Sequence, residues 1–182
     1  LEIKRNGLGA DGREIIDQNT LLKSLKYPSW NRLFHIYDSF KLGLPFNTIQ
    51  DITKIDKWFL YQIQELVMIE KNIEEYNIET IPKSSLKLLK EKGYADRQIA
   101  HLLNCLESEV FEKRQELKIK RVFKLVDTCA AEFEAVTPYY YSTFGDENES
   151  KPSNKKKVLV LGSGPNRIGQ GIEFDYCCVH GV

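Results

Sequence analysis

Residues 57–76 read KWFLYQIQELVMIEKNIEEY and form the longest stretch of the chain with the periodicity of a helix. The apolar positions that keep helical spacing are Phe59, Ile63, Leu66, Val67 and Ile73. Asp56 precedes the stretch, and its carboxylate can accept hydrogen bonds from the first amides of a helix. We therefore expect a long amphipathic helix that begins after Asp56, in a mainly α-helical domain.

Shorter helices are predicted on both sides of this long one. Before it, we expect a helix over Leu21, Leu22 and Leu25 with Asn19 or Thr20 as cap, one from Trp30 to Leu42 ended by Gly43, and one entered through Pro45 with Phe46, Ile49 and Ile52. After it, we expect a helix from Leu86 to Lys92 capped by Ser84 or Ser85 and ended by Gly93, one from Arg97 to Leu103 capped by Asp96, and one near Ser108 to Leu117. The apolar face predicted for the second of these helices comprises Trp30, Leu33, Phe34 and Tyr37.

These helices repeat along the chain. The segment GLPFNTIQDIT from Gly43 aligns with GYADRQIAHLL from Gly93, 50 residues later. One residue is then gained, because the tripeptide Gln64–Leu66 meets Gln115–Leu117 at an offset of 51. Each copy ends one helix at a glycine and continues with a short helix, a turn and a longer helix. Two such helix-turn-helix-like copies can pack their apolar faces on each other.

The character of the sequence changes after Leu117. Residues 118–144 are aromatic, contain Pro138 and show no sustained helical period, which favours an extended segment. Residues 145–157, GDENESKPSNKKK, have almost no apolar side chain and are typical of a linker or surface loop. We therefore expect a helical domain over residues 1–150 and a second, truncated domain over residues 151–182.

The second domain opens with a glycine-rich loop. Val158–Leu161 is predicted to be a buried strand, followed by Gly162, Gly164, Gly169 and Gly171 and the start of a helix, as in many α/β nucleotide-binding folds. The dinucleotide fingerprint fails because Arg167 stands where glycine or alanine is needed. The phosphate-loop pattern fails because Gly169 is followed by Gln170. With the rest of the sheet absent, we expect residues 155–182 to be poorly ordered or abnormally packed.

The composition of the chain argues against a nucleic-acid-binding, membrane or secreted protein. The chain has 182 residues, with 26 basic and 26 acidic side chains, so no net charge attracts nucleic acid or a membrane surface. No apolar run approaches the ~20 residues of a membrane span, and the start lacks both Met and the apolar segment of a signal peptide. The four cysteines favour reduced structural thiols, with zinc binding as the alternative, and the three histidines are not spaced as metal ligands.

A helix-turn-helix DNA-binding regulator is the main alternative function. Residues 95–117 have the required short helix, turn and longer helix. Against this, the start of the recognition helix would carry Glu107, Glu109 and Glu112, which the phosphates of DNA repel. A stand-alone dimerisation module is a further alternative.

Four segments resemble one family. PNRIGQGIEFDYCCVH (165–180) looks like the opening of the second synthetase half of carbamoyl phosphate synthetase large chains, and its 170–173 run favours a bacterial type. KRVFKLVDTCAAEF (120–133) and YYYSTF (139–144) resemble the region before it, and KIDKWFLYQIQELV (54–67) resembles the central helical stretch. The resemblance implies a fragment that covers the oligomerisation domain and the first strand, loop and helix of the second half.

The resemblance also implies a function. Large chains of this family are ligases with two ATP-grasp halves, which make carbamoyl phosphate from bicarbonate, ammonia and two ATP. It implies that the full chain binds ATP with Mg or Mn. It implies a glutaminase small chain as partner and homo-oligomers, with no nucleic-acid or membrane partner. It also implies a cytoplasmic location and a role in arginine and pyrimidine synthesis. Arg167, Gly171 and Glu173 would line the carbamate tunnel. No catalytic, ATP-binding or metal site is expected within these 182 residues.

Trp58 and Phe59, at the head of the long helix, have two interpretations. We favour a place in the core, and the alternative is an exposed interface, where an aromatic pair can anchor a partner.

Overall fold

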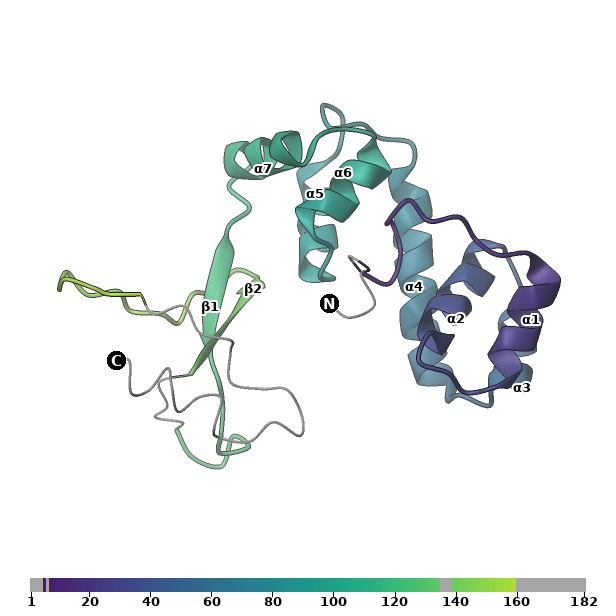
Figure 1. The fold of residues 1–182 in the computed structure, drawn as a ribbon. Coiled ribbons are helices and arrows are strands. Elements are labelled where there is room, and N and C mark those ends of the chain that lie inside the picture. The colour runs from purple at the N-terminus through teal and green to yellow at the C-terminus, as the bar shows by residue number, and fades with distance from the viewer. Residues whose placement is uncertain (1–4, 6, 135–138, 160–182) are drawn as a thin grey trace. The chain divides into compact units, whose positions relative to one another are not determined.

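The computed structural model describes residue 5, residues 7–134 and residues 139–159. The chain divides into two compact units, Leu1–Ser150 and Lys151–Val182. The described part of the first unit is mainly helical, as predicted, and Figure 1 labels its elements. In chain order they are α1 (Gln18–Lys26), α2 (Arg32–Lys41), α3 (Phe46–Thr53), α4 (Lys57–Ile73), α5 (Lys83–Glu91), α6 (Asp96–Leu103), α7 (Glu107–Glu116), β1 (Arg121–Leu125) and β2 (Tyr140–Phe144).

Helix α4 is shared by two hydrophobic cores. Its first half contributes Leu60, Ile63 and Val67 to a core with α2, α3 and the end of α1, which we call the first core. Its second half contributes Ile69 and Ile73 to a second core with residues of α5, α6 and α7. Figure 1 shows α4 running along both groups of helices. The predicted long helix after Asp56 is confirmed, and Asp56 caps it by accepting from the amide of Trp58 at 2.8 Å.

The internal repeat is confirmed in the helix boundaries. The first repeat is α2–α3–α4 and the second repeat is α5–α6–α7. An offset of 50 residues separates the end of α2 from that of α5, both ends of α3 from those of α6, and the start of α4 from that of α7. We predicted that the second repeat gains one residue before Gln115. This prediction is wrong, because the starts of α4 and α7 are still separated by 50 residues. The matching tripeptides therefore do not occupy equivalent helical positions.

Each repeat ends its first helix at a glycine with a positive φ angle, 79° at Gly43 and 90° at Gly93. In each case the next amide donates to a carbonyl in the last helical turn, 3.0 Å away: Leu44 to Ser39 and Tyr94 to Leu89. The left-handed backbone conformation costs little for glycine and more for any residue with a Cβ atom.

We expect Gly93→Ala to lower the free energy of unfolding by about 1–2 kcal/mol, and Gly43→Ala by a similar amount. A Cβ atom at either position would meet no other atom within 4 Å, so the whole effect comes from the backbone. Gly145→Ala is the control, because Gly145 has no positive φ and its added Cβ would lie 3.8 Å from Val122. Urea denaturation measures all three; equal stability of Gly93→Ala and Gly145→Ala would contradict the prediction.

Several predicted helix caps are wrong. Asp17, and not Asn19 or Thr20, caps α1, and its carboxylate accepts from the amides of both residues. Helix α5 begins directly after Pro82, so Ser84 and Ser85 lie inside it. Asp96 is the first residue of α6 and not its cap, and the backbone amide before it, that of Ala95, donates to the Gln98 side chain at 3.0 Å.

The face predicted for α2 is also wrong in part. Tyr37 is buried, but Trp30 and Leu33 are 74% and 56% exposed. The buried positions of α2 begin at Ile36 and continue to Phe40. Because α2 begins at Arg32, Trp30 lies before the helix and does not share its face.

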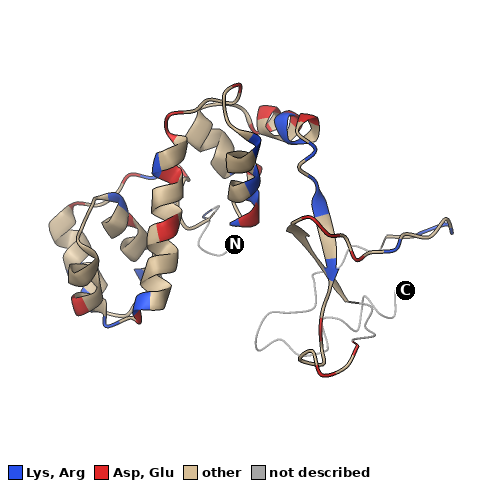
Figure 2. Cartoon of the chain, turned by 180° about the vertical axis from the view of Figure 1, so that it is seen from behind, with Lys and Arg blue, Asp and Glu red and all other residues tan. Residues whose placement is uncertain are grey.

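The predicted extended segment contains an antiparallel pair of strands, β1 and β2, with Arg121 opposite Phe144 and Leu125 opposite Tyr140. The chain then returns along β1, where the Phe123 amide donates to Asn148 at 2.9 Å and the Glu149 amide donates to the Phe123 carbonyl at 2.9 Å. Figure 2 shows basic positions on β1 and acidic positions on the segment that follows β2. The start of the predicted linker is thus tied to the hairpin.

The glycine loop of residues 162–171 lies outside the described residues, as do half of the predicted strand Val158–Leu161 and most of the region 155–182. Val158 and Leu159 are described and exposed.

Candidate functional site

An exposed apolar surface lies where α3 meets the start of α4. We call it the aromatic patch and define it as Phe46, Trp58, Phe59 and Tyr61. Trp58, Phe59 and Tyr61 are 61%, 58% and 53% exposed. The rings of Trp58 and Phe59 meet edge to face with centroids 5.0 Å apart, and Tyr61 stacks on Phe46 at 4.3 Å. The structure therefore brings the predicted pair together at the surface, and the preference for a core position is wrong.

The helical period explains this exposure. Leu60, Ile63 and Val67 take the face of α4 that enters the first core. Trp58 and Tyr61, three residues apart, share a different face. Phe59 was predicted on the buried face because it lies four residues before Ile63, but Leu60, three residues before Ile63, is the buried residue there.

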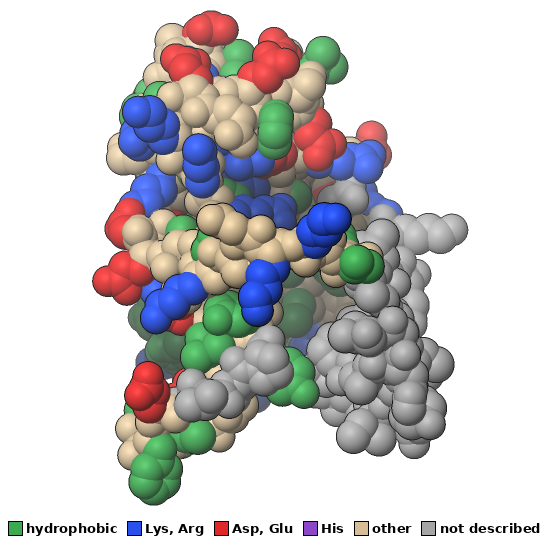
Figure 3. Space-filling view, turned by 90° about the vertical axis from the view of Figure 1, so that its left-hand side faces the viewer, with side chains coloured by type: hydrophobic (Ala, Val, Ile, Leu, Met, Phe, Trp, Pro, Cys, Tyr) green, Lys and Arg blue, Asp and Glu red, His purple; other side chains and the backbone are tan. Residues whose placement is uncertain are grey.

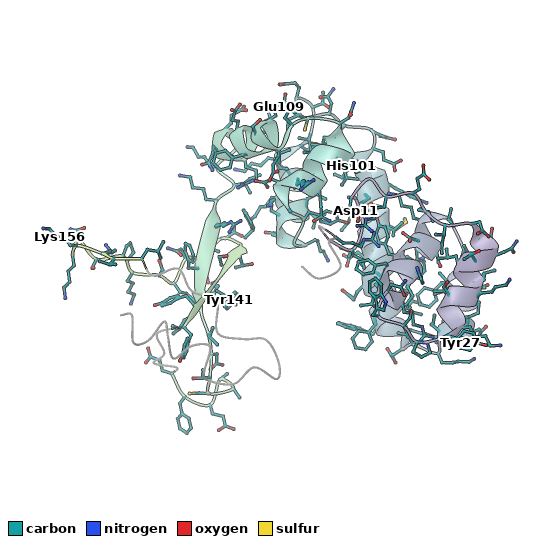
Figure 4. All side chains as sticks on the ribbon, viewed as in Figure 1. Asp11, Tyr27, His101, Glu109, Tyr141 and Lys156 are labelled. Atoms are coloured by element: carbon teal, nitrogen blue, oxygen red, sulfur yellow. The ribbon has the colours of Figure 1, made fainter. Side chains whose placement is uncertain are left out.

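A second exposed apolar group lies between α1 and α2 and consists of Tyr27, Trp30 and Leu33, all more than half exposed. Figure 4 labels Tyr27 beside the end of α1. This group was not predicted, because the apolar spacing of Trp30 and Leu33 indicated a buried helix face. Asn31, a residue type favoured directly before a helix and the residue that precedes α2, was the available signal that the helix starts later than Trp30.

Between the two repeats, α4 carries a buried carboxylate, that of Glu70, which is 2% exposed. It accepts hydrogen bonds from the hydroxyl groups of Tyr37, in the first core, and Tyr94, in the second core; the Tyr94 bond measures 2.9 Å. The Lys41 ammonium lies 3.4 Å from the same carboxylate. Burial and the neighbouring Glu70 raise the pKa of both tyrosines, so their hydroxyls remain donors. Glu70 therefore joins the repeats.

A second polar network, the Asp96 ion cluster, consists of Lys90, Asp96 and Arg114. The Asp96 carboxylate accepts a hydrogen bond from the Lys90 ammonium at 2.7 Å and a bidentate pair of hydrogen bonds from the Arg114 guanidinium. Both cationic side chains are almost wholly buried. Burial works against ionisation of Asp96, but the hydrogen bonds from Arg114 and Lys90 outweigh it and hold the pKa of its carboxyl below the ordinary value of 3.8.

The cluster holds two cations and one anion. Burial lowers the pKa of Lys90 even though Asp96 opposes the change, and the nearby Arg114 adds to the lowering. Phe144 of β2 offers its ring to both cations, 5.0 Å from the Lys90 ammonium and 5.5 Å from the Arg114 guanidinium. The negative ring face partly balances the excess positive charge, so the cluster also fixes the end of the hairpin against the second repeat.

Helix α7 lacks the chemistry of a DNA-recognition helix. Its first turn carries Glu107 and Glu109, and Figure 3 shows acidic side chains over the upper part of the molecule, where α7 lies in Figure 1. Of its cationic side chains, Arg114 is buried on Asp96 and Lys113 pairs with Glu116 at 3.1 Å.

Within residues 7–134 and 139–159, no three His, Cys, Asp or Glu side chains are grouped so as to hold a metal ion. In the same ranges no helix has the length and apolar character needed to cross a bilayer. Cys105 and Cys129 are free thiols, and burial raises the pKa of the Cys105 thiol. The predicted tunnel residues Arg167, Gly171 and Glu173 lie outside the described residues, as do Cys177 and Cys178.

Two families match the chain. Residues 1–118 match the family described as "Carbamoyl-phosphate synthetase large chain, oligomerisation domain". Residues 154–182 match "Carbamoyl phosphate synthase preATP-grasp domain". Neither description mentions DNA binding, so the helix-turn-helix regulator has no support.

Curated relatives of the chain agree with these family matches. The carbamoyl phosphate synthase large chain of Archaeoglobus fulgidus is 51% identical over 187 residues, which cover 100% of this chain and 17% of the relative. That of Synechocystis is 47% identical and covers 99% of this chain and 17% of the relative. The chloroplastic arginine-specific large chain of Arabidopsis thaliana is 49% identical and covers 90% of this chain and 14% of the relative. The chain thus spans about one sixth of these relatives' length, and it belongs to the carbamoyl phosphate synthase large-chain family.

Proposed function

We propose that the chain is the assembly region of a ligase that forms carbamoyl phosphate from bicarbonate, glutamine-derived ammonia and two ATP. The match of residues 1–118 to an oligomerisation domain is the observation that carries this proposal. The exposed aromatic patch supports it, because aromatic side chains are enriched at protein interfaces.

The proposed domain division is a helical oligomerisation domain over residues 1–150 and the start of a synthetic domain over residues 151–182. The two compact units, Leu1–Ser150 and Lys151–Val182, support this division. The match of residues 154–182 to a preATP-grasp domain supports the identity of the second part.

Further properties of the full enzyme belong to the same proposal. ATP with Mg or Mn would bind in other parts of the large chain, and a glutaminase small chain would supply ammonia. Arg167, Gly171 and Glu173 would contribute to the wall of the carbamate tunnel. A cytoplasmic location and a role in arginine and pyrimidine synthesis complete it; the free thiols of Cys105 and Cys129 fit a reducing compartment.

The full large chain, mixed with its small chain, should form carbamoyl phosphate from bicarbonate, glutamine and ATP. The 182-residue chain alone should hydrolyse no ATP above background, since no complete nucleotide-binding motif occurs in its sequence. Coupled assays of ADP and carbamoyl phosphate measure both. ATP hydrolysis by the short chain would contradict the proposed division of labour, and a full chain unable to form carbamoyl phosphate would contradict the function.

A further inference from the structure

The two repeats use equivalent positions for different chemistry. Lys90 and Asp96 form an ion pair at 2.7 Å in the second repeat. Fifty residues earlier, at the equivalent positions of the first repeat, Phe40 and Phe46 meet with ring centroids 6.0 Å apart. One repeat therefore has a charged cluster where the other has an aromatic contact.

The charged face of the second repeat is covered by the chain itself. Phe144, from β2, lies against Lys90 and Arg114 and packs on the second core. This covering shows that the face at the start of α6 accepts an aromatic side chain from another element.

The equivalent face of the first repeat remains open among the described residues. Phe46 stacks on Tyr61, and Trp58 and Phe59 form a second ring pair at the start of α4. Trp58, Phe59 and Tyr61 are each more than half exposed. None of these side chains carries a charge. The exposed charges beside the patch are balanced in sign, because Asp51 pairs with Lys54, and Asp56 and Lys57 directly precede Trp58. An apolar centre with a balanced polar edge is the usual composition of a protein interface.

We propose that the aromatic patch is a homotypic docking surface, on which a second copy of the same large chain binds across a two-fold axis. A two-fold axis places the same patch on both partners, so the patch must be compatible with itself. Uncharged aromatic rings meet this condition, because each patch buries the other without bringing like charges together. The inference rests on the proposed function and adds to it the surface that performs assembly.

Two other exposed apolar groups fit self-association less well. The face of α7 would bring Glu107, Glu109 and Glu112 of two copies together. The group Tyr27, Trp30 and Leu33 adjoins the last turn of α1, which carries Lys23 and Lys26. Two copies joined there would bring those lysines together, and like charges at an interface are unfavourable.

The test is sedimentation equilibrium of the full large chain with Trp58→Glu and, separately, Tyr61→Glu. Each variant would bury a carboxylate without a partner, and the dissociation constant should rise at least about tenfold. Phe111→Glu is the matched control, because Phe111 is the repeat equivalent of Tyr61 and is 51% exposed. Trp30→Glu is the second control, since Trp30 is the other tryptophan of the chain and is also exposed. Both controls should leave the dissociation constant unchanged.

Circular dichroism establishes that each variant is folded, and Trp58→Ala and Tyr61→Ala replace any variant that is not; they too should weaken association. Unchanged association in the folded patch variants, or loss of association in Trp30→Glu instead, would overturn the patch as the docking surface. A wild-type full chain that stays monomeric at every concentration would overturn the assembly role itself, so the two failures are distinguishable.

Discussion

Replacing Asp96 with alanine should lower the free energy of unfolding by about 3–5 kcal/mol, the cost of removing one partner from a buried ion pair. The variant leaves Lys90 and Arg114 without their shared counter-charge, and both side chains are almost wholly buried. Phe144 offers only the face of its ring to these cations. We therefore expect loss of the second repeat's packing before that of the first, as measured by urea denaturation and by hydrogen exchange of α5–α7 amides.

The control is Asp51→Ala, which removes an acid from an exposed pair with Lys54. Exposed pairs of this kind contribute about 0–1 kcal/mol. A loss after Asp96→Ala no greater than that after Asp51→Ala would show that the buried cluster contributes no more than a surface pair.

The Asp96 effect should also depend on pH in a defined direction. The pKa of Asp96 is lower in the folded chain than its ordinary value of 3.8, so the unfolded chain binds the proton more tightly. The stability that Asp96 contributes is therefore present above pH 3.8 and is lost as the pH falls through the lower folded value. The difference between wild type and Asp96→Ala should shrink over that acidic range.

The helices were predictable because their signals are local. Asp56, Gly43 and Gly93 act on the backbone within a few residues, and the structure uses them as predicted. The repeat was visible for the same reason, since matching stops recur after matching lengths of helix. Errors arose where two neighbouring signals competed, as at Asp17 beside Asn19 and Thr20, all of which can cap a helix.

The surface and the polar networks were not predictable in this way. Trp58 and Phe59 are apolar, and a single sequence does not distinguish an aromatic ring buried in the core from one exposed at a binding surface. The hydrogen bond from Tyr37 to Glu70 joins residues 33 positions apart. Arg114 and Asp96 are 18 positions apart. Such partners are set by how the helices pack, and no spacing rule relates them.

Glu70→Ala should lower the free energy of unfolding by about 2–5 kcal/mol, since an unpaired buried donor costs about 1–3 kcal/mol. The change leaves the hydroxyls of Tyr37 and Tyr94 without their acceptor. It also opens a cavity beside α4 at the junction of the two cores, which adds to the loss. Because one tyrosine belongs to each core, we expect the two repeats to unfold less cooperatively in urea, with a broader transition than in wild type.

Glu65→Ala is the matched control, because Glu65 lies on the same helix but is exposed in its pair with Lys92, 2.8 Å away, and its loss should cost less than about 1 kcal/mol. Glu70→Gln should fall between the two, since an amide oxygen still accepts one hydroxyl but carries no charge. A double-mutant cycle with Tyr37→Phe isolates the Tyr37–Glu70 interaction, and we expect a coupling free energy of about 1–3 kcal/mol. A coupling near zero would mean that Glu70 acts by filling space, and the two repeats would then be held together by the apolar faces of α4 alone.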